Sequence, residues 1–124
     1  MATVFTPLTK GFAWTLSTTD ANGNPLPDGE IEYSATVGIR ADGDPNHSPG
    51  SYQYFVTVGP NVSTVTLAQV IAAKVPPGAN YWAAVDQTDG LNGTTNTSAW
   101  TEEIPFSIPV QPVRPAPPTN FTVA

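Results

Sequence analysis

The stretch DANGNPLPDGE, residues 20–30, is rich enough in side-chain oxygens to suggest a cation site. An EF-hand calcium loop needs ligands at its first, third and fifth positions, a glycine at the sixth and a glutamate at the twelfth. Counted from Asp20, the sixth residue is Pro25 and the twelfth is Ile31, so the pattern fails where the backbone turns most sharply. The Asn-Gly and Asp-Gly dipeptides favour a chain reversal between two strands. We therefore expect a turn here and no metal site.

Two other groups of residues could support catalysis. His47 is the single histidine, and Asp42 and Asp44 precede it closely, so it could bind a metal or act as a base. Glu30 and Glu32 alternate along one strand and could form a carboxylate pair of the glycosidase kind. However, the sequence has no G-x-S-x-G motif, and no other polar residues converge on these groups. We interpret His47 as a solvated loop residue and predict a non-enzymatic protein without catalytic residues, cofactor or metal.

The composition restricts the classes of partner. The 124 residues suit one domain, and only 11% of them are charged, with a net charge of −6. The four basic residues are scattered along the chain, which argues against nucleic-acid binding because phosphates require clustered cations. No apolar run approaches the roughly 20 residues that span a bilayer, so we expect no membrane insertion. There is no cysteine, and the N-terminus does not have the pattern of a secretory signal.

The hydrophobic pattern predicts strands. In EIEYSATVGIR, residues 30–40, apolar and polar residues alternate, as expected for a strand with one buried face. Five further segments show the same period, and turn signals rich in Gly, Pro and Asn separate them. Their expected inward residues are Phe12, Trp14, Leu16, Tyr52, Tyr54, Val56, Val58, Val65, Leu67, Tyr81, Ala83, Val85, Ile104, Phe106 and Ile108. This arrangement predicts an all-β antiparallel sandwich.

Two segments differ from the rest. LAQVIAAK, residues 67–74, has helix formers and apolar spacing that fit one short helix, although an irregular extended connection fits equally well. After Pro109 the chain becomes proline-rich, and proline cannot donate a hydrogen bond to a central strand ladder. We therefore divide the chain into a sandwich domain, residues 1–109, and an extended polyproline-like arm, residues 110–124. The end of the arm, TNFTVA, could form a strand only on the edge of another sheet.

Several motifs resemble those of immunoglobulin-like domains. TDANGNPLPDGEIEYSA resembles a segment of bacterial immunoglobulin-like domains of the invasin type. VPPGANYWAAVD and TSAWTEEIPFSI resemble the last two strands of a fibronectin type III repeat, and PAPPTNFTVA resembles the first strand of a following repeat. The resemblance implies an immunoglobulin-like sandwich of about seven strands, in which the Tyr81 hydroxyl bonds to the backbone of residues 75–78. The structural core residues that we expect are Trp14, Tyr33, Tyr81, Val85 and Phe106.

Candidate interaction residues lie outside the inward set. Trp82 alternates with Tyr81 and should lie on the outer sheet face, with Trp100 nearby and Arg40 placed to stack on a ring. These aromatics could simply cover the sheet, or they could form a platform for a sugar or a protein. In the arm, the residues that could engage a neighbour are Val113, Arg114, Phe121 and Val123.

The sequence favours a structural and interaction protein. A cysteine-free sandwich with a proline-rich arm resembles bacteriophage capsid decoration and tail-associated proteins, which are made in the host cytoplasm and assemble onto the virion. This resemblance implies docking on a protein lattice or neighbouring subunits in many copies, with the arm adding a strand to a neighbour's sheet. The alternative is an adhesion, spacer or carbohydrate-binding module of a secreted or cell-surface bacterial protein, with glycans as ligands.

Overall fold

The computed structural model describes residues 2–19, 22–25, 34–89, 96–110 and 115–123. Within these ranges the chain forms strands and one short helix, so the prediction of an all-β sandwich is confirmed. The strands are β1 (Thr6–Pro7), β2 (Gly11–Ala13), β3 (Ser34–Ala41), β4 (Tyr54–Val58), β5 (Thr64–Thr66), β6 (Ala79–Asp89), β7 (Asn96–Thr97) and β8 (Ile104–Ile108).

The main sheet has the strand order β1-β8-β6-β3-β4, and β7 pairs with the far end of β6. The central pair is β3 and β6, which run antiparallel with Val37 opposite Val85 and Ile39 opposite Ala83. Strand β4 forms one edge and the short β1 the other. The prediction that all strands are antiparallel is wrong at one place, because β1 runs parallel to β8.

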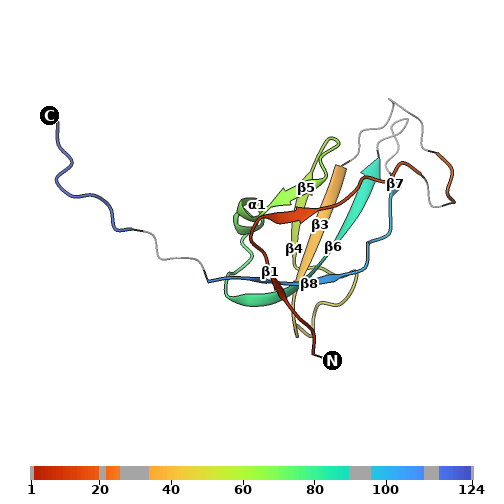
Figure 1. Ribbon diagram of the computed structural model, residues 1–124, viewed down its shortest axis with the longest axis horizontal. Coiled ribbons are helices and arrows are strands. Elements are labelled where there is room, and N and C mark those ends of the chain that lie inside the picture. Colours follow the sequence, from red (N-terminus) through yellow and green to blue (C-terminus); the bar gives the residue numbers. More distant parts are fainter. Residues whose placement is uncertain (1, 20–21, 26–33, 90–95, 111–114, 124) are drawn as a thin grey trace.

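The second layer is smaller. Strands β2 and β5 pair with each other, and the helix α1 (Leu67–Ala72) follows β5 directly (Figure 1). The helix begins at a capping box, in which the Thr66 side chain accepts from the Gln69 N–H and the Gln69 side chain accepts from the Thr66 N–H. This cap explains why residues 67–72 turn into a helix instead of extending β5, so the helix is the one of the two alternatives for this segment that is present.

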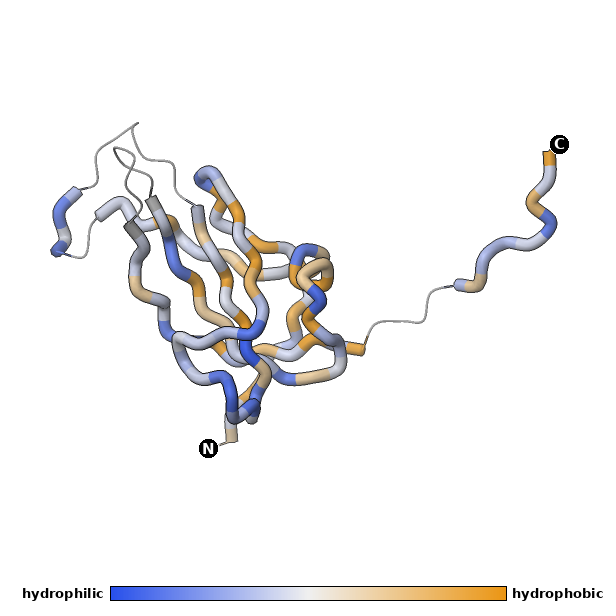
Figure 2. Tube along the Cα trace, turned by 180° about the vertical axis from the view of Figure 1, so that it is seen from behind, coloured by the Kyte–Doolittle hydropathy of each residue, from blue (hydrophilic) through white to orange (hydrophobic). Residues whose placement is uncertain are grey.

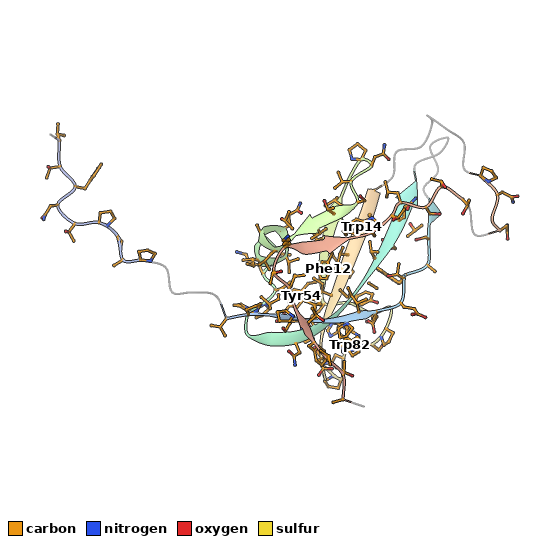
Figure 3. All side chains as sticks on the ribbon, in the orientation of Figure 1. Phe12, Trp14, Tyr54 and Trp82 are labelled. Carbon is orange, nitrogen blue, oxygen red and sulfur yellow. The ribbon has the colours of Figure 1, made fainter. Side chains whose placement is uncertain are left out.

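The hydrophobic core lies between the two layers. Val37 and Ile39 of β3 pack there with Val65 of β5 and Val70 of α1, each at most 2% exposed. Figure 3 shows Phe12 and Tyr54 reaching toward this interior, where they are partly buried against the core. Four of the five expected core residues lie in or against this cluster, namely Tyr81, Phe106, Trp14 and Val85. Tyr33 lies outside the described residues.

Two inward predictions are wrong. Ile104 is 52% exposed. It lies two residues before Phe106, the first residue of β8 that pairs with β1, so no strand of the described chain flanks Ile104 on that edge of the sheet. Tyr52 is buried, but it lies on the opposite face of the sheet from the core. The Tyr52 ring lies over Gly38 on that opposite face.

Of the acidic stretch at residues 20–30, the structure describes residues 22–25, which form a turn. Thr19 and Pro25 form an antiparallel bridge, and Gly23 between them has a φ of +83°, in the left-handed region that glycine adopts without strain. Residues 26–33, including Glu30 and Glu32, lie outside the described part of the chain. The reversal that the Asn-Gly dipeptide predicts is therefore present.

The arm leaves the main sheet after β8. Residues 115–123 lie away from both layers and are exposed throughout (Figure 1). Figure 2 shows hydrophobic positions near the end of this segment, and the side chains of Phe121 and Val123 are each 99% exposed. Val113 and Arg114 lie outside the described residues.

The Tyr81 hydroxyl donates a hydrogen bond to the carbonyl oxygen of Pro76, within the segment expected from the sequence. Tyr81 is 2% exposed and its ring stacks on Phe106, so burial raises the pKa of the hydroxyl and keeps it protonated as a donor. The bond ties the start of β6 to the connection from α1.

We expect Tyr81→Phe to lower the free energy of unfolding by about 1 kcal/mol, because the Pro76 carbonyl loses its partner. Urea denaturation of the full chain measures this change. Tyr54→Phe is the matched control, since no hydrogen bond of the Tyr54 hydroxyl is present within the described residues. Equal stability changes in the two variants would contradict the proposed role of the hydroxyl.

Candidate functional site

The candidate interaction residues meet on the outer face of the main sheet, away from the second layer. Arg40 of β3 lies directly opposite Trp82 of β6. The guanidinium carbon lies 5.5 Å from the centroid of the Trp82 ring, which is the range of a cation–π interaction. The stacking of Arg40 on a ring that the sequence suggested is therefore present.

Glu103 fixes the other side of the same guanidinium. The Arg40 Nε donates to Glu103 Oε2 at 2.8 Å, and Nη2 donates to Oε1 at 2.7 Å, which is a two-pronged pair. The two side chains are only 13% and 11% exposed. The Arg40 guanidinium, and to a smaller extent the Tyr52 hydroxyl, hold the pKa of the Glu103 carboxyl below its usual range. This pair joins β3 to the segment that enters β8.

Tyr52 reaches the outer face through an irregularity at the start of β4. Ile39 lies opposite Tyr54, but its carbonyl accepts from the N–H of Gln53 at 2.8 Å, so two residues oppose one, as in a β-bulge. The extra residue shifts the side-chain alternation by one position. A Cβ on Gly38 would lie 2.5 Å from the Tyr52 ring, so the ring lies directly over the glycine.

Trp100 packs on Tyr52. Their ring centroids are 4.8 Å apart and the rings meet edge to face. Trp100 is held near the sheet by its neighbour Thr101, whose N–H donates to the Val85 carbonyl at 3.0 Å. The two tryptophans are therefore connected through Tyr52, Glu103 and Arg40.

Trp82 has two further partners. Its indole Nε1 donates to Asp42 Oδ1 at 3.0 Å, and its ring meets Phe5 edge to face at 5.6 Å. Both tryptophans are partly buried, and Ala84 on the same face of β6 is 5% exposed. We call this set the outer cluster: Phe5, Gly38, Arg40, Asp42, Tyr52, Trp82, Ala84, Trp100 and Glu103.

The packing of the outer cluster favours a covering role. A sugar platform presents the face of an aromatic ring to solvent. Here the Trp82 face carries a guanidinium, and Tyr52 is 8% exposed. This packing favours the first of the two interpretations that the sequence left open, in which the rings cover the sheet.

Two other titratable sites lie within the described ranges. His47 Nδ1 lies 3.1 Å from Asp44 Oδ2 in the β3–β4 connection. A hydrogen bond from the Asn46 N–H, and to a smaller extent the contact with His47, lowers the pKa of the Asp44 carboxyl. Burial raises the pKa of the Asp86 carboxyl on β6. In the described part of the chain, no three His, Asp or Glu side chains come together as metal ligands.

Comparisons with known proteins add no family. No protein-family model matches this chain, and no curated protein matches it either. Among the described residues there is also no helix with the length and apolarity needed to cross a membrane.

Sequence reasoning missed several members of the outer cluster. Glu103, Asp42 and Phe5 carry no motif that links them to Arg40 or Trp82. Tyr52 had a signal, because Gly38 lies between Val37 and Ile39 within a strand, and an isolated strand glycine often marks a close approach by another group.

We expect Glu103→Gln to destabilise the protein by about 2 kcal/mol at neutral pH, because the partly buried Arg40 loses its counter-charge. The folded-state pKa of Glu103 lies below its unfolded value of about 4.3. The contribution is therefore complete above that value and is lost as the pH falls through the folded-state pKa. Urea unfolding at several pH values should show the two proteins converging in acid.

Glu102→Gln is the control for this experiment, because Glu102 is exposed and adjacent. Its effect should stay within about 0.5 kcal/mol at every pH. A Glu103→Gln defect that persists unchanged in acid would contradict the ionic role of Glu103.

We expect Gly38→Ala to destabilise the protein by about 1–3 kcal/mol, because the new methyl group must displace the Tyr52 ring. The same change in a Tyr52→Ala background should have a much smaller effect, since the space is then open. Unfolding free energies of the four proteins measure the coupling. An equal loss in both backgrounds would show that Tyr52 does not lie over Gly38.

Proposed function

We propose that this chain is a non-enzymatic structural protein of the bacteriophage virion surface, present in many copies and docked on neighbouring protein subunits. The observation that carries the proposal is the arm, in which the apolar side chains of Phe121 and Val123 are 99% exposed. Covering a Phe or Val side chain is worth about 1.5–3 kcal/mol each. An extended segment with this composition is suited to binding another sheet edge.

The strand neighbours support an immunoglobulin-like sandwich. In that fold the strands C, F and G form one sheet, which a C′ strand can extend, and B and E belong to the other. Strands β3, β4, β6 and β8 have the neighbours expected of C, C′, F and G, and β2 with β5 those of B and E. The Tyr81 bond to Pro76, at the corner that leads into β6, fits the tyrosine corner of such domains.

The internal pairing of the outer cluster supports docking through other parts of the molecule. Its aromatic and charged groups are already paired with each other, so little contact energy is left for a partner there. The arm and the sheet edges retain exposed apolar side chains and backbone groups. Many weak contacts of this kind become strong together when the chains are arranged on a repeating surface.

The direct test is to locate the chain in its natural source. Antibodies against the purified chain should detect it in DNA-filled particles banded on a density gradient, at a constant ratio to the major capsid or tail protein. Detection as part of a longer polypeptide in the cell-envelope or secreted fraction would contradict the virion assignment and support the adhesion or spacer alternative.

A glycan array separates the carbohydrate-binding alternative. We expect no glycan binding that depends on Trp82 or Trp100. Binding that is lost in both Trp82→Ala and Trp100→Ala, with the fold retained by circular dichroism, would instead establish an aromatic sugar site.

A further inference from the structure

We propose that the partner of the arm is a second copy of this chain, and that residues 119–123 of one copy pair with strand β4 of the next. This inference rests on the proposed function and specifies the neighbour that the arm engages. It follows from the edges of the two sheets, the composition of both segments and the direction in which the arm leaves the domain.

Strand β4 is the sheet edge best suited to accept another strand. It is last in the order of the main sheet and contains five residues, Tyr54–Val58, without proline. The opposite edge, β1, has two residues, one of them Pro7, and the strands of the second layer have three each. Proteins usually protect a long edge with charge, proline or a covering segment. No charged residue occurs between residues 51 and 66.

The outer side of β4 has apolar surface to cover. Phe55 is 54% exposed, whereas Val56 and Val58 on the inner side are 8% and 9% exposed. Phe55 therefore offers the contact that an added strand would make, and the inner positions are already filled by the core.

The end of the arm matches this edge. In TNFTV, residues 119–123, Phe121 and Val123 are two positions apart and so lie on one face of an extended strand. Thr, Phe and Val all favour strands. Asn120 has a φ of 58°, so the unpaired arm bends there and must extend when it pairs.

Charge also favours self-pairing of these segments. Each chain carries a net charge of −6, which makes two copies repel at most orientations. Residues 115–123 and residues 51–66 are both without charged side chains. The arm and the β4 edge can therefore meet without bringing like charges together.

The direction of the arm favours another copy over the arm's own domain. Ile108, the last residue of β8, lies opposite Ala79 at the end of the sheet where β4 also begins. The arm's own β4 is three strands away, roughly 14 Å. Five of the ten residues from 109 to 118 are prolines, a composition that favours an extended chain over the tight turn needed to return.

The residue types of the arm and of β4 favour one register of pairing. With the strands antiparallel and Phe121 opposite Phe55, the two aromatic rings share the outer face and Thr119 lies opposite Thr57, both favourable cross-strand pairs. Thr122 then points to the other face. The chain has no cysteine, so this register can be read directly with introduced thiols.

The test is a cross-link between two differently labelled chains. A Thr57→Cys chain and a Thr119→Cys chain are mixed under mild oxidation, and a disulfide between them can form only between copies. We expect a covalent heterodimer on non-reducing gels. The matched control replaces the second chain by Thr122→Cys, which should give only background. No heterodimer with Thr119→Cys, or equal amounts with both partners, would overturn the proposal.

Association of chains without cysteine provides the second measurement. Light scattering should show the mass rising above 13.0 kDa with concentration for the unchanged chain and for Ala116→Pro. In this register the Thr119 N–H faces β4, so Thr119→Pro removes a pairing donor and should stay monomeric. A monomeric unchanged chain, or a Thr119→Pro chain that associates normally, would contradict self-pairing. These experiments contain only the purified chain, so the virion assignment stands or falls separately on particle fractionation.

Discussion

A sheet has two faces, and in this protein the second layer covers only one of them. The core between β3, β6 and the β2–β5–α1 layer buries the inner face. The outer face would expose the central strands to water without a second cover. Arg40 organises that cover, because its guanidinium stacks on Trp82 and forms a two-pronged pair with Glu103. The small residues Gly38 and Ala84 allow the rings to lie close to the backbone. The cover over the outer face of the main sheet depends on this arrangement.

The pairing within the outer cluster also bears on where the proposed docking takes place. Its groups are paired among themselves, so its loss should destabilise the domain before it changes any binding. The arm is different, because residues 115–123 are exposed throughout and can be altered with little effect on the two layers. The proposed function thus separates stability from assembly: the sandwich is the rigid body, and the arm with the β4 edge is the proposed contact surface.

The sequence predicted the two-layer architecture because the alternation through Val37 and Ile39 and through Tyr81 and Ala83 survives in the structure. It also offered the short helix at residues 67–74 as one of two alternatives. It could not predict the parallel pairing of β1, which depends on a two-residue contact with β8. The single extra residue opposite Ile39 moved Tyr52 to the other face, which a strict two-residue period cannot anticipate. The Arg40–Glu103 pair joins residues far apart in sequence, and no local pattern links them.

A double-mutant cycle on Arg40 and Glu103 measures whether their ion pair stabilises the folded domain. The free energy of unfolding is measured for the unchanged chain, Arg40→Met, Glu103→Gln and the double variant. A pair that forms part of the folded cover should show a favourable coupling of about 1 kcal/mol or more. A coupling near zero, as exposed ion pairs often give, would show that the outer face is solvated and that the cluster does not hold the sheet.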